Sequence, residues 1–352
     1  MGSQKVIQLI WKKPLLALCG FLLFVLALGL MKEGAGGLAP LLRSYLEITN
    51  AADSMGFGWL MSYLILSGSP VAAAAVALLS AEALSPLQAF TMVAGSRLGA
   101  SFIVLLIGFI YALRGHNHWT ALTTGVLSLL TCSSIQLVAL PMGVLILSRG
   151  WLDDLTLPAL EGLAAGINLG LKPLISPFAA VLPGWALFVA GMGLVTLSFR
   201  FFDRALPQMR LERTDFNQIA RLVYRPEIMF LIGLAVTVLT LSVSISVGIL
   251  VPLSARGYLR RENIIPYILG ANTSTFADTL VAAALLGDPR AVTVVITHMV
   301  CAAIVSLLLI LVAYRSFEQA ISHALAWINR RHRNFALFLG IILVIPLVLI
   351  LL

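Results

Sequence analysis

Long apolar stretches recur along the whole chain, and this feature restricts the fold more than any other. Most of them approach or exceed the roughly 20 residues that a helix needs to cross about 30 Å of hydrocarbon. Hydrophobic residues make up 60% of the chain and charged residues only 11%, far from the composition of soluble domains. No stretch has the alternation of a strand, so the sequence predicts an all-α multi-pass membrane protein, with apolar stretches at 14–31, 86–113, 119–148, 176–199, 228–250, 289–314 and 335–352.

Basic residues gather in a few connecting segments, and these predict the topology. Loops rich in Lys and Arg stay in the cytoplasm, whereas the acidic or mixed segments at 32–56 and 149–161 are expected outside. We therefore expect a protein of the plasma (inner) membrane with a cytoplasmic N-terminus, whose first apolar run is a retained helix rather than a signal peptide. The basic segments lie at 5–13, 200–225, 256–261 and 315–333.

Two apolar stretches contain polar breaks near their centres. Ser67, Gly68 and Ser69 interrupt residues 57–82, and the serines of "SVSIS" interrupt residues 228–255. If 57–82 were a full crossing, the arginine-rich segment at 200–225 would lie on the outer side. Charge therefore favours two re-entrant hairpins of opposite sense, since irregular backbone at membrane depth has to line a protein-enclosed site. Close packing of helices through small residues is the alternative.

A shift of 175 residues aligns the two breaks, pairing Ser67 with Ser242 and Gly95 with Gly270. Each half then contains a spanning helix, a hairpin, an interrupted helix and another spanning helix, which predicts two inverted-topology repeats of the kind found in secondary transporters. The predicted interrupted helices are 86–113 and 263–286. We expect four units. Residues 1–155 form the first repeat, and residues 156–227 contain a linking segment, the first spanning helix of the second repeat (176–199) and a basic loop. Residues 228–314 form the rest of the second repeat, and residues 315–352 form a basic segment with a C-terminal helix.

The residues around these breaks resemble the type II sodium-dependent phosphate cotransporter family. "GANTST" at 270–275 is similar to the family's Gly-Ala-Asn-Ile-Gly-Thr-Thr segment, and "GSRLGAS" at 95–101 resembles the first-repeat counterpart, with Arg97 in the place of the Asn. The family's Gln-Ser-Ser-Ser signatures correspond to "LSGS" at 66–69 and "LSVS" at 241–244, where both glutamines are missing. The resemblance covers about residues 20–314 and implies cotransport of sodium and phosphate.

The repeats and the resemblance together predict one central site. A helix broken within the bilayer exposes N–H groups that suit an anion and carbonyl groups that suit a small cation such as Na+. We expect the substrate to contact Ser67, Gly68, Ser69, Arg97, Ser242, Ser244, Asn272 and Thr273, and the ion to contact Ser246, Ser274, Thr275 and Asp278.

Arg97 and Asp278 are functional candidates because ionisable residues are costly to bury inside a membrane. Arg97 either contacts an oxyanion through its planar guanidinium or acts as a fixed cation, with Asp278 as its partner or as a cation ligand. A plain ion pair that holds the two halves together is the alternative.

The sequence thus predicts an ion-coupled secondary transporter of a small anion, with alternating access, phosphate as the first candidate substrate and Na+ as the candidate coupling ion. The alternative is a membrane-embedded enzyme or regulatory protein that keeps the scaffold without transport. No nucleotide-binding loop or hydrolase motif is present, so we expect no enzyme activity. We expect no cofactor and no metal beyond Na+, membrane lipids as partners, and no nucleic acid; a homo-oligomer stays open.

Overall fold

The computed structural model describes residues 3–44, 48–114, 118–152, 158–205, 225–255, 259 and 261–352. Within these ranges the chain is helical and contains no β-strand. Seven helical segments in this described part are long and apolar enough to cross a membrane, so the chain is an all-α integral membrane protein. They are α1 (Ser3–Ser44), α4 (Pro86–Leu113), α5 (His118–Ser148), α7 (Gly184–Ala205), α12 (Arg261–Ser274) with α13 (Ala277–Leu286), α14 (Pro289–Leu311) and α16 (His332–Ile350).

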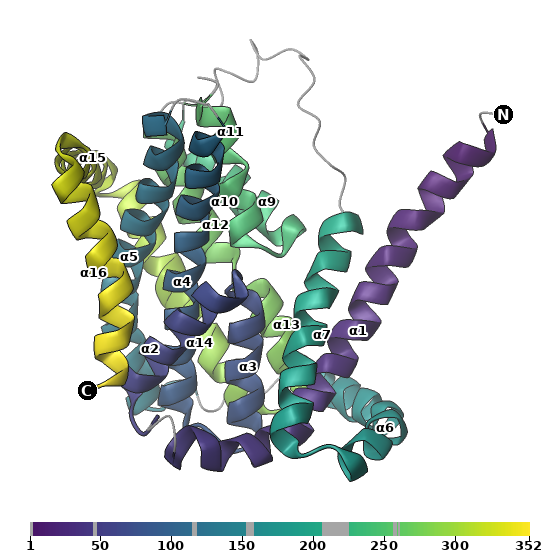
Figure 1. Ribbon diagram of the computed structural model, residues 1–352. Helices are drawn as coiled ribbons and strands as arrows, with labels where there is room; N and C mark the ends of the chain where they lie inside the picture. Colours follow the sequence, from purple (N-terminus) through teal and green to yellow (C-terminus); the bar gives the residue numbers. More distant parts are fainter. Residues whose placement is uncertain are drawn as a thin grey trace.

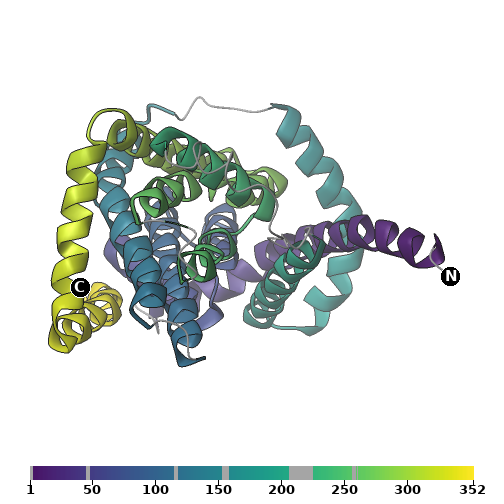
Figure 2. The same ribbon diagram turned by 90° about the horizontal axis from the view of Figure 1, so that it is seen from above.

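Shorter helices complete the bundle and lie at different heights (Figure 1). Two of them occupy the lower half, α2 (Ala51–Ile65) and α3 (Ser69–Ser80), and three occupy the upper half, α9 (Pro226–Thr240), α10 (Val243–Gly248) and α11 (Leu250–Ala255). The two remaining helices are α6 (Pro158–Val181), near the lower end of Figure 1, and α15 (Tyr314–Arg330), near its upper end. Figure 2 shows from above that they lie on opposite sides of the bundle.

Helix breaks lie at both polar interruptions of the apolar stretches. α2 ends at Ile65 and the next residue, Leu66, has φ 56°. α9 ends at Thr240 and the next residue, Leu241, has φ 50°. Leucine rarely adopts positive φ because its Cβ collides with the backbone there, so packing around the two breaks has to hold both turns in place.

The predicted interruption within 86–113 is wrong, because α4 is one continuous helix. Gly95 and Gly99 do not break it. They allow α2 to pack closely against α4. A Cβ on Gly99 would lie 2.5 Å from the Cβ of Ser62, and a Cβ on Gly95 would overlap the carbonyl oxygen of Met55. Small residues four apart are a common means of bringing two membrane helices into backbone contact. The second predicted interruption is present, between α12 and α13 at Thr275 and Phe276.

The contact between α2 and α4 recurs between α9 and α12. In each pair a glycine on one helix lies against a backbone carbonyl group on the other, and each helix supplies one such glycine. The four positions of the first pair lie 175 residues before those of the second. The contacts are Gly58 with Met92 and Gly95 with Met55, then Gly233 with Tyr267 and Gly270 with Phe230.

The predicted spanning helix at 176–199 has the wrong boundaries. α6 continues to Val181, and α7 begins only at Gly184 and runs to Ala205. Pro183 explains the division, because proline disfavours helical backbone at the preceding residue and has no N–H to donate. Most of the basic segment 315–333 lies in the amphipathic helix α15, which ends at Arg330 and buries Ile321, Leu325 and Ile328. Residues 206–224 of the basic segment 200–225 lie outside the described residues.

Candidate functional site

A cavity of about 550 Å³ lies between the two helix breaks and is bordered by α4 and α7. Its volume falls within the range of about 300–1,000 Å³ that is common for ligand pockets. The break between α2 and α3, the break between α9 and α10, and the helices α4 and α7 all contribute to its wall. Three predicted substrate contacts line it, namely Ser67, Ser242 and Ser244.

The segments at both breaks contact the same turn of α4. From one side, Gly68 approaches so closely that a Cβ there would lie 2.7 Å from the Ser96 oxygen and 2.9 Å from the Ala100 Cβ. From the other side, Ser244 Oγ donates to the Ala100 carbonyl oxygen at 3.4 Å. Ser242 begins α10, where its Oγ accepts from the Ile245 N–H at 3.3 Å. This turn of α4 therefore brings together two segments that are far apart in the sequence.

The helix α7 adds polar residues that were not predicted as part of the site. Thr196, Arg200 and Asp203 line the cavity, and their spacing places them on one face of the helix. Arg200 was expected only as part of a cytoplasmic basic segment. The 196–200–203 spacing next to an apolar run is the sequence signal that could have identified this face.

Arg97 belongs to a second polar group, between α4 and the break that separates α12 from α13. Its side chain is only 2% exposed. The guanidinium donates to Thr275 Oγ1 at 3.0 Å, to Thr279 Oγ1 at 2.6 Å and to Asp278 Oδ1 at 3.4 Å. Its carbon lies 4.9 Å from the centre of the Phe276 ring, which is within cation–π range. The polar contacts of this side chain thus come from residues 275–279.

The pairing of Arg97 with Asp278 is incomplete. Within the described part of the chain, Arg97 Nε and Asp278 Oδ2 are both buried without a hydrogen-bond partner. Asp278 Oδ1 also accepts from the Thr279 backbone N–H at 2.5 Å and from Thr279 Oγ1 at 2.9 Å. An arginine–carboxylate pair often uses two parallel hydrogen bonds, and this pair uses one long one. Thr279 and Phe276 were not predicted as site residues.

Most of the other predicted residues form hydrogen bonds with neighbouring groups of the protein. Three side chains at the end of α12 donate to carbonyl groups one turn earlier: Asn272 to Ile268, Thr273 to Leu269 and Ser274 to Gly270. Ser246 Oγ lies 2.7 Å from Thr237 Oγ1 and 2.9 Å from the Tyr267 hydroxyl. Ser69 is buried at the start of α3. The structure therefore distributes the predicted contacts over the cavity, the Arg97 group and local hydrogen bonds.

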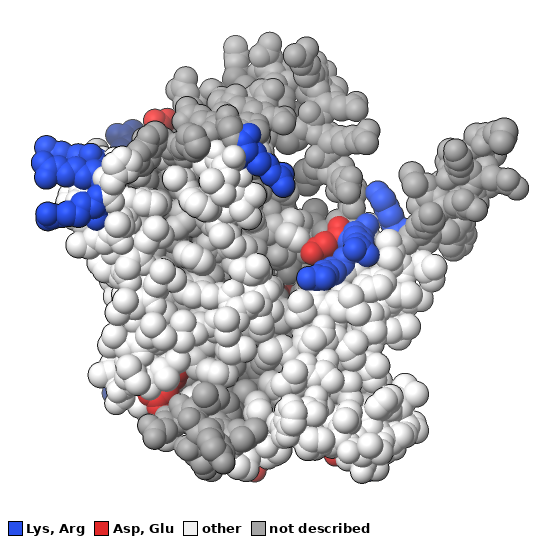
Figure 3. Space-filling view, viewed as in Figure 1, with Lys and Arg blue, Asp and Glu red and all other residues white. Residues whose placement is uncertain are grey.

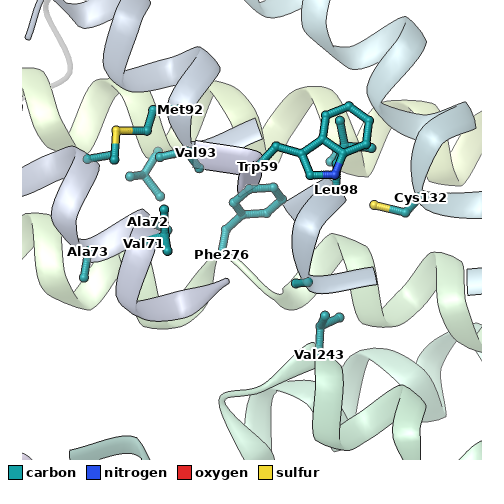
Figure 4. Close-up of a cluster of buried hydrophobic side chains, with 14 of the residues drawn as sticks. Trp59, Val71, Ala72, Ala73, Met92, Val93, Leu98, Cys132, Val243 and Phe276 are labelled. Atoms are coloured by element: carbon teal, nitrogen blue, oxygen red, sulfur yellow. The ribbon is translucent and has the colours of Figure 1, made fainter. Parts of the chain in front are cut away.

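A buried aromatic stack adjoins the Arg97 group. Phe276 lies within the apolar cluster drawn in Figure 4, and its ring centre is 4.6 Å from that of His298. The other ring neighbour of His298 is Phe90, at 4.7 Å. His298 Nε2 lies 2.9 Å from Gln136 Oε1, so this buried histidine forms a hydrogen bond with a side chain of α5.

Comparison of the chain with protein-family models, curated proteins and solved structures found no match. In the described part of the chain, no three His, Cys, Asp or Glu side chains are grouped so that they could hold a metal ion. The functional assignment therefore depends on the geometry of the chain, and the resemblance to the phosphate cotransporters stays a prediction.

Proposed function

We propose that this protein is an ion-coupled secondary transporter of a small anion and that it works by alternating access at the cavity between the two helix breaks. One observation carries the proposal. α2 and α9 run inward from opposite ends of the bundle, and the breaks that follow them contact the same turn of α4 beside the cavity. Broken helices that face a central site are the arrangement expected of such transporters.

The second part of the proposal is that the two halves are inverted repeats, with α2–α3 and α9–α11 as re-entrant hairpins. The bounds of α2 and α9 differ by 175 residues at both ends, and the left-handed residues Leu66 and Leu241 differ by the same number. In Figure 1, α2 rises from the lower end, whereas α9 descends from the upper end. Two oppositely inserted copies of one unit would account for both observations.

We propose further that the upper end in Figure 1 faces the cytoplasm of a plasma (inner) membrane. On the face drawn in Figure 3, most of the visible Lys and Arg side chains lie in the upper half, several of them at the level of α15, whereas Asp and Glu are visible both in the upper half and at the lower edge. The excess of Lys and Arg in cytoplasmic loops supports this orientation. It also supports a cytoplasmic N-terminus, because α1 begins at the upper end.

The chemistry of the cavity favours an anion. Arg200 supplies a permanent positive charge on a wall that also carries the carboxyl group of Asp203, and the hydroxyl groups of Ser67, Ser242 and Ser244 can donate hydrogen bonds to oxygen atoms. Phosphate is the first candidate through the resemblance, with Na+ as the coupling ion that the resemblance implies. The volume of about 550 Å³ exceeds that of a bare oxyanion, so small organic anions belong in the same test.

Uptake into proteoliposomes tests the proposal. Radiolabelled phosphate, sulfate and small carboxylates are offered to vesicles that carry the purified protein, with and without ion gradients. Arg200→Gln should lower uptake by about tenfold or more, because a hydrogen bond to a charged group contributes about 1.5–3 kcal/mol. Arg204→Gln is the matched control, since Arg204 is on the same helix and does not line the cavity. Absence of flux for every anion would favour the alternative, a scaffold that has lost transport.

A further inference from the structure

We infer that Arg97 is a built-in cation: its guanidinium occupies the position that a coupling cation such as Na+ would take at the break between α12 and α13. This inference rests on the proposed anion transport and replaces Na+ as the coupling ion of that proposal. The break then needs no free metal ion, and anion uptake does not depend on sodium.

The oxygen atoms around the guanidinium are of the type that binds a small hard cation. Two hydroxyl groups, from Thr275 and Thr279, and one carboxylate oxygen, from Asp278, lie 2.6–3.4 Å from its nitrogen atoms. Hard cations prefer oxygen ligands of these kinds. α12 ends at Ser274, and the carbonyl end of a helix adds a partial negative charge. The break therefore presents a cation site, and Arg97 fills it.

The geometry differs from that of an ion pair whose purpose is to join two helices. Such a pair would place two guanidinium nitrogens opposite both carboxylate oxygens. Here the guanidinium is shared among Thr275 at the break and Asp278 and Thr279 in the first turn of α13, while Arg97 Nε and Asp278 Oδ2 have no hydrogen-bond partner among the described residues. Sharing one cation among several oxygens at a helix break is the pattern of ion coordination.

The arginine reaches this position from a different element. It projects from α4 one turn before Ala100, the residue against which both breaks of the cavity pack. At 2% exposure its charge is hardly screened by water, so a second cation at the same oxygens would be repelled. The positive charge is thus delivered by the protein from the helix that also contacts the transport cavity.

Thermal unfolding of the purified protein in detergent tests the inference without any need for transport. Melting temperatures are compared in NaCl and in choline chloride at equal ionic strength. Arg97→Ala removes the built-in cation and leaves the oxygens, so Na+ should raise its melting temperature by about 2 °C or more through preferential binding to the folded state. The wild-type protein and Arg97→Lys, which keeps a tethered charge, should give equal values in both salts.

A double variant identifies the site. Arg97→Ala combined with Asp278→Asn should lose the sodium response, because the charged ligand is gone. A sodium response in the wild-type protein, or none in a folded Arg97→Ala protein, overturns the inference. If Arg97→Ala does not fold, anion uptake by the wild-type and Arg97→Lys proteins is compared in NaCl and in choline chloride. A difference of less than about twofold between the two salts supports the inference. A larger difference overturns it.

Failure of the inference and failure of the proposed function are distinguishable. Anion uptake that requires sodium would leave the transporter proposal standing and remove the built-in cation. If Arg97→Ala responds to sodium but the protein transports no anion, the built-in cation stands and the transporter proposal fails.

Discussion

Gly270→Ala is expected to destabilise the protein through the contact between α9 and α12. A Cβ on Gly270 would lie 2.8 Å from the Phe230 carbonyl carbon and 2.9 Å from the Leu234 nitrogen, and it would overlap the Phe230 oxygen. All three atoms are backbone, so no side chain can rotate away. The two helices have to separate by about 0.7 Å or more before the carbon atoms reach an ordinary contact distance near 3.5 Å.

Two opposing effects set the size of the change. Strain and lost contacts from overpacking cost about 1–3 kcal/mol, whereas replacing a helical glycine by alanine stabilises the helix by up to about 1 kcal/mol. Gly193→Ala on α7 isolates the second effect, because nothing lies within 4 Å of a Cβ built there. We therefore expect Gly270→Ala to be about 2 kcal/mol less stable than Gly193→Ala.

The assay is thermal unfolding in detergent, followed by the fluorescence of the six tryptophans. Gly95→Ala serves as a second test, because its Cβ would lie 3.0 Å from backbone atoms of Met55 and Trp59 and would overlap the Met55 oxygen. It should be destabilised to a similar degree as Gly270→Ala. If both variants melt at the temperature of Gly193→Ala, the close approach of these helix pairs is refuted.

Three further predictions follow from single contacts. Leu66→Gly should raise the melting temperature, since glycine removes a left-handed leucine that costs about 1–2 kcal/mol, whereas Leu64→Gly within α2 should lower it; equal shifts would contradict the strained turn. Gln136→Leu should destabilise by about 1–3 kcal/mol because His298 loses its partner, and adding His298→Leu should recover part of the loss; a neutral Gln136→Leu would argue against this hydrogen bond. Arg330→Cys in a cysteine-free protein should react with a membrane-impermeant maleimide only in permeabilised cells, and labelling of intact cells would reverse the proposed orientation.

Several elements could be predicted because their signal is local. Most of the apolar stretches predicted spanning helices, although the stretch at 176–199 had the wrong boundaries. The polar interruptions at Ser67 and Ser242 predicted breaks, and each lies one residue after the left-handed leucine that follows α2 or α9. Hydrophobic length and helix-breaking residues act on neighbouring positions, so both can be found without knowledge of the fold. The 175-residue shift also held for contacts that the sequence did not suggest, such as Gly58 with Met92 and Gly233 with Tyr267.

The errors arose where one residue type serves two purposes. Glycines at 95 and 99 are compatible with a broken helix and with a closely packed one, and only the position of α2 decides between them. Polar side chains are ambiguous in a similar way, because a hydroxyl or amide group that is expected to face a site can also form hydrogen bonds within the protein. Ser246, Asn272 and Thr273 form such bonds, and their role in the site stays a prediction.

By itself, the sequence determined the membrane class, the breaks that follow α2 and α9, and the shift of 175 residues that relates these two breaks, because apolar length and polarity are properties of contiguous residues. Only the tertiary structure decided which polar groups meet. Arg97 reaches the α12–α13 break across about 180 residues of chain, and Arg200 joins Ser67 and Ser244 at one cavity because α7 packs beside both breaks. The partner of a buried charge is set by how distant helices pack, and residue order does not reveal that packing.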